Sequence, residues 1–187
     1  GGYDLQGLAD SAGAALAALV DEEYRPEAPS NGGPGHHIVE AVKRGFELSE
    51  ASHTPVMLQL RIRACHVHGE FVADDNRRPA FTLEQALDHP QRDVDRIVLP
   101  PASFLHEQEK VMQRWPAAVR FIEERGLNEF FAADADDIGI IVQGGNYNTL
   151  LRVLERLGHA DVYGRTRVPL YVMNVAYPVV ESEVLRF

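Results

Sequence analysis

The strongest constraint on the fold of this chain is a pair of apolar runs that enclose one amphipathic segment. The runs at 138–142 (IGIIV) and 168–175 (VPLYVMNV) are continuous, as is typical of strands buried on both faces. Between them, Gly144 and Gly145 mark a turn. The helix that follows ends at Gly158, and its apolar face contains Tyr147, Leu150, Leu151, Leu154 and Leu157. This order predicts a strand–helix–strand unit with parallel strands, and therefore an α/β fold.

The first part of the chain predicts further helices and a strand. Asp10 or Ser11 is a candidate cap for a helix through 14–23, and the Gly- and Pro-rich segment 25–35 is predicted as a loop. A second helix is expected over 36–49, with an apolar face at Ile38, Val39, Val42 and Phe46. A strand with one apolar face follows, because its apolar residues alternate: Val56, Leu58, Leu60 and Ile62.

A polar segment at 70–96 is predicted to link two units, with a short helix near 83–87. A longer helix begins near Phe104, and its apolar stripe contains Val111, Trp115, Ala118, Val119 and Ile122. Pro116 interrupts this stripe, so we expect a kink or a new helix there, and Gly126 is a natural end. The acidic clusters at 134–137 and 181–183 are predicted as solvated loops.

Charge and composition exclude several classes of protein. The 187 residues contain 28 acidic and 18 basic side chains, which gives a net charge of −10 with neutral histidines. We therefore expect no nucleic-acid partner and no anionic membrane surface, since both need a basic face. No apolar run approaches the length of a membrane span, and the single cysteine, Cys65, cannot form a disulfide within the chain. A reducing, cytoplasmic location is the expectation.

The richest short segment for chemistry is RIRACHVHG at 61–69, at the end of a predicted strand. Arg61 and Arg63 could hold a carboxylate through paired hydrogen bonds. His66 and His68 share one face if the strand continues, but no third ligand lies nearby, so we expect no metal. Cys65 points to the opposite face from its neighbour His66, and we interpret it as a core thiol.

The turn formed by Gly144, Gly145 and Asn146 follows a strand and precedes a helix, a place where backbone amides favour an anion. The turn has neither a dinucleotide-binding glycine pattern nor the lysine of a phosphate-binding loop. A tight turn that needs small residues explains it equally well. No serine–histidine–aspartate set is apparent, so the residues alone predict no reaction and no catalytic residue.

The order of segments resembles one enzyme family. PVMLQLRIRACHVHG (55–69), preceded by the helix 41–50, resembles the end of the pyrimidine-binding domain of indolepyruvate:ferredoxin oxidoreductases, with Arg63, His66 and Gly69 at the family's positions. Pro29 and Ser30 resemble the Pro-Ser before that helix. Segments 107–131, 139–158 and 169–179 resemble the family's next domain, a transketolase-C-terminal-like α/β unit that ends a strand in an aromatic-Pro pair, here Tyr177 and Pro178.

The resemblance implies a thiamine-diphosphate enzyme that oxidatively decarboxylates aryl 2-oxo acids to acyl-CoA, with Mg²⁺, iron–sulfur clusters and ferredoxin. The chain has no counterpart of the catalytic glutamate half of the pyrimidine-binding domain, of the Gly-Asp-Gly region or of the cluster cysteines. We therefore expect an internal piece, inactive by itself. Its implied units are an N-terminal helix and loop (1–35), the end of a pyrimidine-binding-type domain (36–69), a linker (70–96) and a transketolase-C-terminal-like domain (97–187).

Within the parent enzyme, Arg63, His66 and Arg61 are candidates to face substrate or cofactor. The expected partners are the remaining domains or subunits and ferredoxin. Other classes remain open. One is a non-catalytic assembly domain that forms a homo-oligomer, such as a dimer. Another is a flavodoxin-like binder with a phosphate at Gly144 and Gly145, and a third is a metal hydrolase using His66 and His68.

Overall fold

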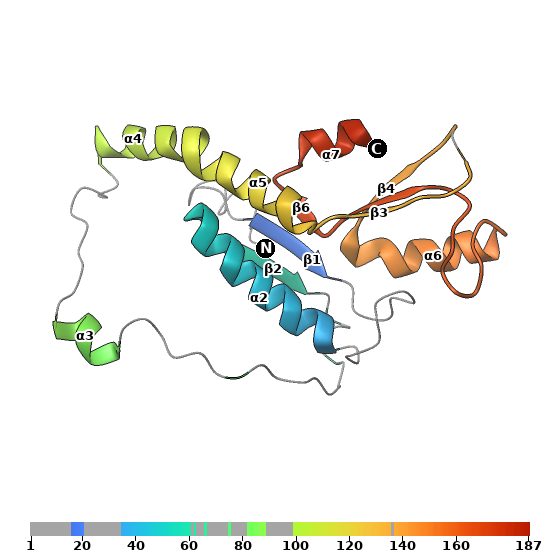
Figure 1. Ribbon diagram of the computed structural model, residues 1–187, viewed down its shortest axis with the longest axis horizontal. Coiled ribbons are helices and arrows are strands. Elements are labelled where there is room, and N and C mark those ends of the chain that lie inside the picture. The colour runs from blue at the N-terminus through green and yellow to red at the C-terminus, as the bar shows by residue number, and fades with distance from the viewer. Residues whose placement is uncertain are drawn as a thin grey trace, which may run out of the picture.

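The computed structural model describes residues 16–20, 35–60, 62, 66, 75, 82–88, 99–135 and 137–187. These residues form two three-stranded sheets with helices packed against them (Figure 1). Each sheet combines one parallel and one antiparallel strand pair. The predicted combination of helices and sheet is confirmed, but the sheets are mixed and not purely parallel.

The first sheet has the strand order β2-β1-β6. Its strands are β1 (Leu16–Val20), β2 (Val56–Leu60) and β6 (Val175–Tyr177). β1 runs parallel to β2 and antiparallel to β6, so the predicted helix through 14–23 is wrong over β1. A short run of Leu, Ala and Val fits either pattern, and pairing with a strand on each side stabilises the extended form.

The second sheet has the order β3-β5-β4, with β3 (Glu129–Phe131), β4 (Ile140–Gln143) and β5 (Leu170–Met173). β4 pairs in parallel with β5, and α6 (Tyr147–Arg156) lies between them in sequence, which confirms the strand–helix–strand unit. Central β5 is buried, as predicted. β4 lies at an edge and Ile141 is exposed, so the prediction of burial on both faces is wrong for this strand.

The two sheets are joined by one continuous stretch of chain. β5 ends at Met173 and β6 begins at Val175, so Asn174 alone separates them. Asn174 Nδ2 donates to the backbone oxygen of Leu127 at 2.8 Å and to a carboxylate oxygen of Glu129 at 2.9 Å. These bonds hold the bend between the sheets against the turn that precedes β3.

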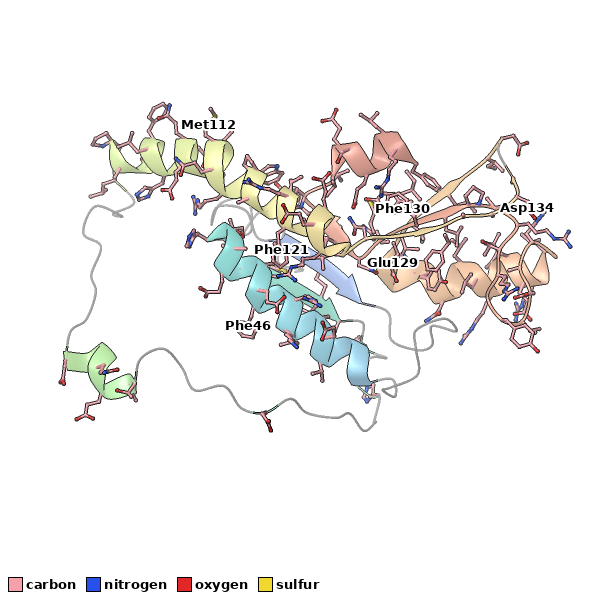
Figure 2. All side chains as sticks on the ribbon, viewed as in Figure 1. Phe46, Met112, Phe121, Glu129, Phe130 and Asp134 are labelled. Atoms are coloured by element: carbon pink, nitrogen blue, oxygen red, sulfur yellow. The ribbon has the colours of Figure 1, made fainter. Side chains whose placement is uncertain are left out.

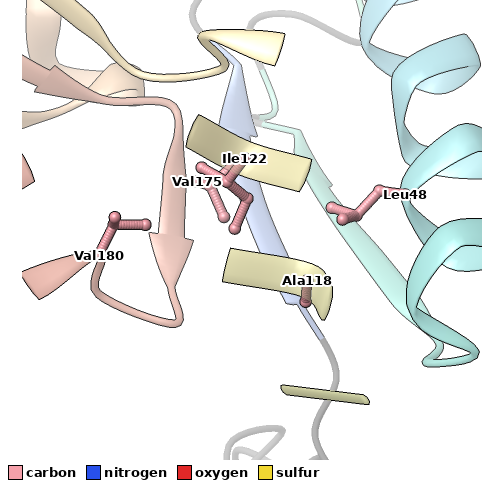
Figure 3. Packing of buried hydrophobic residues seen from close by; sticks show 5 residues of the cluster. All are labelled: Leu48, Ala118, Ile122, Val175 and Val180. Atoms are coloured by element: carbon pink, nitrogen blue, oxygen red, sulfur yellow. The ribbon is translucent and has the colours of Figure 1, made fainter. Parts of the chain in front are cut away.

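One hydrophobic cluster lies where α2 (Gly35–Ser52) and α5 (Trp115–Arg125) pack over the first sheet (Figure 3). Its buried members are Leu48, Ala118, Ile122, Val175 and Val180. The predicted helix at 36–49 is confirmed, but its predicted buried face is wrong, because Leu48 is 2% exposed and Phe46 is 71% exposed. Ile62 is also exposed, beyond the end of β2.

α5 begins next to Pro116, and the chain stays helical through this point, with a change of helix type just before it (Figure 1). α4 (Ala102–Glu109) passes through a π-helical turn (Lys110–Arg114) into α5, whose second residue is Pro116. A wider turn accommodates a residue that lacks an N–H and crowds the preceding carbonyls. Gly126 ends α5 in the left-handed region at φ 57°, and Leu127 N donates to Ile122 O at 3.1 Å.

The second hydrophobic cluster lies between α6 and the second sheet. Its buried members are Tyr147, Leu151, Leu154, Leu170 and Val172. The predicted helical face is confirmed at Tyr147, Leu151 and Leu154, whereas Leu157 is exposed. Gly158 follows the helix with φ 76°, as a left-handed end requires.

Two short helices complete the fold. α3 (Leu83–Asp88) is the predicted helix of the linker segment, and Thr82 caps it by accepting a bond from Gln85 N at 3.2 Å. α7 (Glu181–Arg186) carries the C-terminal Phe187 onto the ring of Tyr171, with the ring centroids 5.9 Å apart. Over the described ranges, none of the helices is both long enough and apolar enough to span a membrane.

Candidate functional site

The structure describes only part of the arginine- and histidine-rich segment that follows β2. Arg61, Arg63, Cys65 and His68 lie outside the described residues, whereas His66 is described and exposed. Among the residues that the structure covers, no group of three or more His, Cys, Asp or Glu side chains could hold a metal ion. The predicted roles of Arg61, Arg63 and His66 therefore remain predictions.

The glycine turn has the predicted strand–turn–helix geometry. Gly144–Asn146 forms a 3₁₀ turn between β4 and α6, and no side chain caps the start of α6. Gly144 and Gly145 are buried, while Asn146 is exposed. The turn also lies beside β1, so the two sheets approach each other here. The anion role of Gly144, Gly145 and Asn146 stays a prediction.

A buried polar cluster lies at the junction of the two sheets, and the sequence did not predict it. Asn128 Nδ2 donates to Glu183 Oε2 at 2.7 Å and to Tyr171 Oη at 3.2 Å, and its Oδ1 accepts from Val175 N at 2.9 Å. Tyr171 Oη donates to the same Glu183 oxygen at 2.8 Å. The cluster thus connects the turn before β3, the central strand, β6 and the C-terminal helix.

Glu183 corrects an expectation from the sequence. The sequence predicts a solvated loop at 181–183, yet Glu183 lies in α7 and is 5% exposed. The signal was present in the spacing of Val180, Glu183 and Val184, which fall on one helical face. A glutamate on an apolar helical face is a candidate for burial when polar partners such as Asn128 and Tyr171 are available.

The environment of Tyr171 keeps its hydroxyl protonated. Burial raises the pKa of Tyr171 well above its usual value of 10.0, and the hydrogen bond to Glu183 and the charge of that carboxylate raise it further. The hydroxyl therefore acts as a donor across the neutral range. This pairing suits a structural connection between β5 and α7, because both side chains are buried.

A cavity of about 520 Å³ lies at the other end of the second sheet. Its aromatic wall includes Phe131 and Tyr147, whose rings stack with centroids 5.3 Å apart. Asp134 and Arg165 place one charge of each sign on the polar part of the lining. Figure 2 labels Phe130 and Asp134 in this region of the chain. No local sequence pattern indicates this cavity, because its lining comes from β3, α6 and a loop that lie far apart in sequence.

Comparison with known proteins gives two distant relatives. The chain is 26% identical over 160 residues to "Indolepyruvate oxidoreductase subunit IorA" of Methanothermobacter marburgensis, which covers 85% of this chain and 24% of the relative. It is 25% identical over 142 residues to the subunit of the same name in Methanothermobacter thermautotrophicus, covering 75% of this chain and 21% of the relative. No family model matches the chain. No solved structure matches it.

These matches support a distant relationship to 2-oxoacid oxidoreductases. The resemblance stated from the sequence is confirmed at that level. The chain spans about a quarter of the length of the curated relatives it matches. Most of each relative therefore has no counterpart in this chain.

Proposed function

We propose that this chain is part of a thiamine-diphosphate-dependent 2-oxoacid:ferredoxin oxidoreductase of the indolepyruvate type. The parent enzyme would oxidatively decarboxylate aryl 2-oxo acids to acyl-CoA and pass electrons to ferredoxin. The observation that carries the proposal is the pair of matches to indolepyruvate oxidoreductase subunits, which extend over 85% and 75% of the chain. Matches of this length involve both halves of the chain and not a single local motif.

The proposed division of the chain follows the same resemblance. Residues 36–69 would form the end of a pyrimidine-binding-type domain, and 97–187 a transketolase-C-terminal-like domain, with 70–96 as the linker. The parallel pair of β4 and β5 around α6 supports the second assignment. α2 and β2 support the first, because a helix followed by a strand occurs where the family has them.

The residues of this chain do not form a complete cofactor site. The sequence has one cysteine and no Gly-Asp-Gly segment, so it can neither ligate an iron–sulfur cluster through four thiolates nor provide that Mg²⁺-binding motif. In our proposal thiamine diphosphate, Mg²⁺ and the clusters are held by the remaining domains or by a partner. In this proposal the isolated chain is inactive, and Arg63 and His66 would face substrate or cofactor in the assembled enzyme.

The proposed function assigns Arg63 to the substrate carboxylate. A guanidinium that binds the substrate carboxylate through two hydrogen bonds contributes on the order of 2 kcal/mol, so Arg63→Ala should lower kcat/KM about thirtyfold in the assembled enzyme. Arg120→Ala is the matched control, since Arg120 is exposed on α5. Unchanged steady-state kinetics for Arg63→Ala would remove Arg63 from the substrate site.

An assembly domain without catalytic residues is the second candidate, and one observation favours it. Several large apolar side chains of α2 are exposed, including Phe46. Sedimentation of the isolated chain separates this candidate from the enzyme part. A stable dimer that binds no oxidoreductase component favours the assembly domain.

The first test of the proposed function is to read the coding sequence on both sides of this chain. The proposal expects an upstream region with a pyrimidine-binding half that carries a glutamate, and a Gly-Asp-Gly region in the same frame or in a neighbouring gene. Flanking sequence that encodes unrelated proteins would contradict it. The result of this test does not depend on the three-dimensional structure of the chain.

A further inference from the structure

The α2 flank, which we define as Val39, Val42 and Phe46, is an apolar stripe that the rest of the described chain leaves open. The three side chains are 37%, 41% and 71% exposed. Phe46 and Leu48 are roughly 200° apart around the helix, so the flank lies opposite the buried face. Figure 2 shows Phe46 on the side of α2 away from α5. A helix that is apolar on opposite sides is typical of one packed between two layers.

The flank continues into an apolar groove between α2 and β2. The groove has a volume of about 170 Å³, and its lining includes Val42, Phe46, Ser49, Val56 and Leu58. Gly45 helps to keep it open, because a Cβ added there would lie 3.5 Å from Val56 Cγ1. The groove therefore connects the α2 flank directly to the side chains of β2.

β2 also presents a strand edge on this side. In the sheet order β2-β1-β6, β2 is the terminal strand of the described part of the chain. The backbone groups of an edge strand are available to pair with another strand. The unpaired edge of β2 lies beside the exposed α2 flank. One additional strand could pair with β2 while a helix attached to it covers the α2 flank.

The charges of α2 indicate an apolar partner. Arg44 Nε lies 2.9 Å from Glu40 Oε1, and Arg44 Nη1 lies 2.8 Å from Glu47 Oε2. Arg44 thus pairs with both carboxylates within the helix, and the three groups together keep a single negative charge, so the apolar flank and not this charged cluster defines the partner. The partner should contribute aliphatic or aromatic side chains to the flank and the groove.

We propose that the α2 flank and the edge of β2 form the docking site for a strand–helix unit supplied by the part of the parent oxidoreductase that this chain lacks. The inference rests on the proposed function. The length of the relatives favours this occupant, because about three quarters of each has no counterpart here. A second copy of this chain is the competing occupant, and it would bring a second α2 to the flank.

Site-specific photocrosslinking tests this docking site. The full chain carries p-benzoylphenylalanine at position 46, and it is produced together with the polypeptides encoded by the flanking sequence. The matched control carries the same group at position 163, since Tyr163 is equally exposed at 71% but lies in the loop after α6. We expect crosslinks from position 46 to a flanking polypeptide, in a segment with strand and helix character, and none from position 163.

Substitution gives a second, independent measurement. Phe46→Ser should weaken binding of the flanking polypeptide at least tenfold, because a large aromatic side chain buried in an interface is a typical hot spot. Tyr163→Ser should leave it unchanged. Phe46→Ser should also leave the melting temperature of the isolated chain unchanged, since the side chain is exposed there.

Crosslinks from position 46 to a second copy of this chain, or to nothing, overturn the docking site. An assembled enzyme that oxidises indolepyruvate without a crosslink at position 46 overturns the docking site and leaves the proposed function in place. A specific crosslink in a complex that lacks this activity supports the docking site and counts against the proposed function.

Discussion

Asn128 links the two sheets through hydrogen bonds, and its side-chain amide acts as both a donor and an acceptor. Its nitrogen donates to Glu183 and Tyr171, and its oxygen accepts from Val175 N. Asn128→Asp keeps the shape but replaces the donor with a second buried carboxylate beside Glu183. We expect the free energy of unfolding at pH 7 to fall by about 2–4 kcal/mol.

Urea unfolding measures this change, and Asn146→Asp is its control. Asn146 is exposed at the start of α6, where a negative charge is neutral or slightly stabilising. If the two substitutions changed stability equally, the contacts of Asn128 would not hold the sheets together.

Because the pKa of Tyr171 is raised in the folded protein, we expect the free energy of unfolding to fall at high pH. Its pKa is raised in the folded protein by burial and by Glu183, so folding favours the protonated hydroxyl. Its stabilising contribution is complete below the unfolded pKa near 10 and declines as the pH rises above that value, by up to about 1.4 kcal/mol per pH unit. The difference in unfolding free energy between wild type and Tyr171→Phe should therefore shrink or reverse above pH 10.

The matched control for this pH series is Tyr163→Phe, since Tyr163 is exposed in a loop. This variant removes an exposed phenol and serves as the reference for the series. A difference for Tyr171→Phe that follows the Tyr163→Phe reference at every pH would contradict the raised pKa of Tyr171.

Replacing Gly126 or Gly45 by alanine should change the stability of the protein in opposite directions. Gly126 has φ 57° and open space around it, so Gly126→Ala should destabilise the protein by about 1 kcal/mol through backbone strain alone. Gly45 lies inside α2, and an added Cβ would make an ordinary contact with Val56. Gly45→Ala should stabilise the protein by about 1 kcal/mol, because it removes the helix-interior cost of glycine.

Thermal unfolding of the two variants measures these effects side by side. A loss of stability on Gly45→Ala would show that the groove beside β2 does not tolerate a methyl group. No loss on Gly126→Ala would show that α5 does not need its left-handed end.

At the scale of elements, local patterns predicted helices better than they predicted which face is buried. Backbone chemistry determined by a single residue explains the helix ends at Gly126 and Gly158 and the change of helix type before Pro116. The buried face of α2 depends instead on where α5 lies, and its buried residues include Ser52, whose hydroxyl donates to Leu48 O at 2.7 Å. The apolar flank that dominated the pattern faces outward.

At the scale of the whole molecule, the sequence predicted one strand–helix–strand unit and not the order of strands. β1 lies between β2 and β6, which come from distant parts of the chain, and no local pattern encodes that pairing. The buried cluster of Asn128, Tyr171 and Glu183 was missed for the same reason. The candidate residues Arg61 and Arg63 came from the sequence alone and lie outside the described residues.

The proposed part of this chain in indolepyruvate oxidation is tested by the reduction of ferredoxin by indolepyruvate and coenzyme A, with thiamine diphosphate and Mg²⁺ supplied. Three samples are compared: this chain alone, the polypeptides encoded by its flanking sequence alone, and the assembly of both. We expect the assembly to reduce ferredoxin and neither part to do so by itself. Full activity without this chain, or an assembled complex that does not oxidise indolepyruvate, would contradict it.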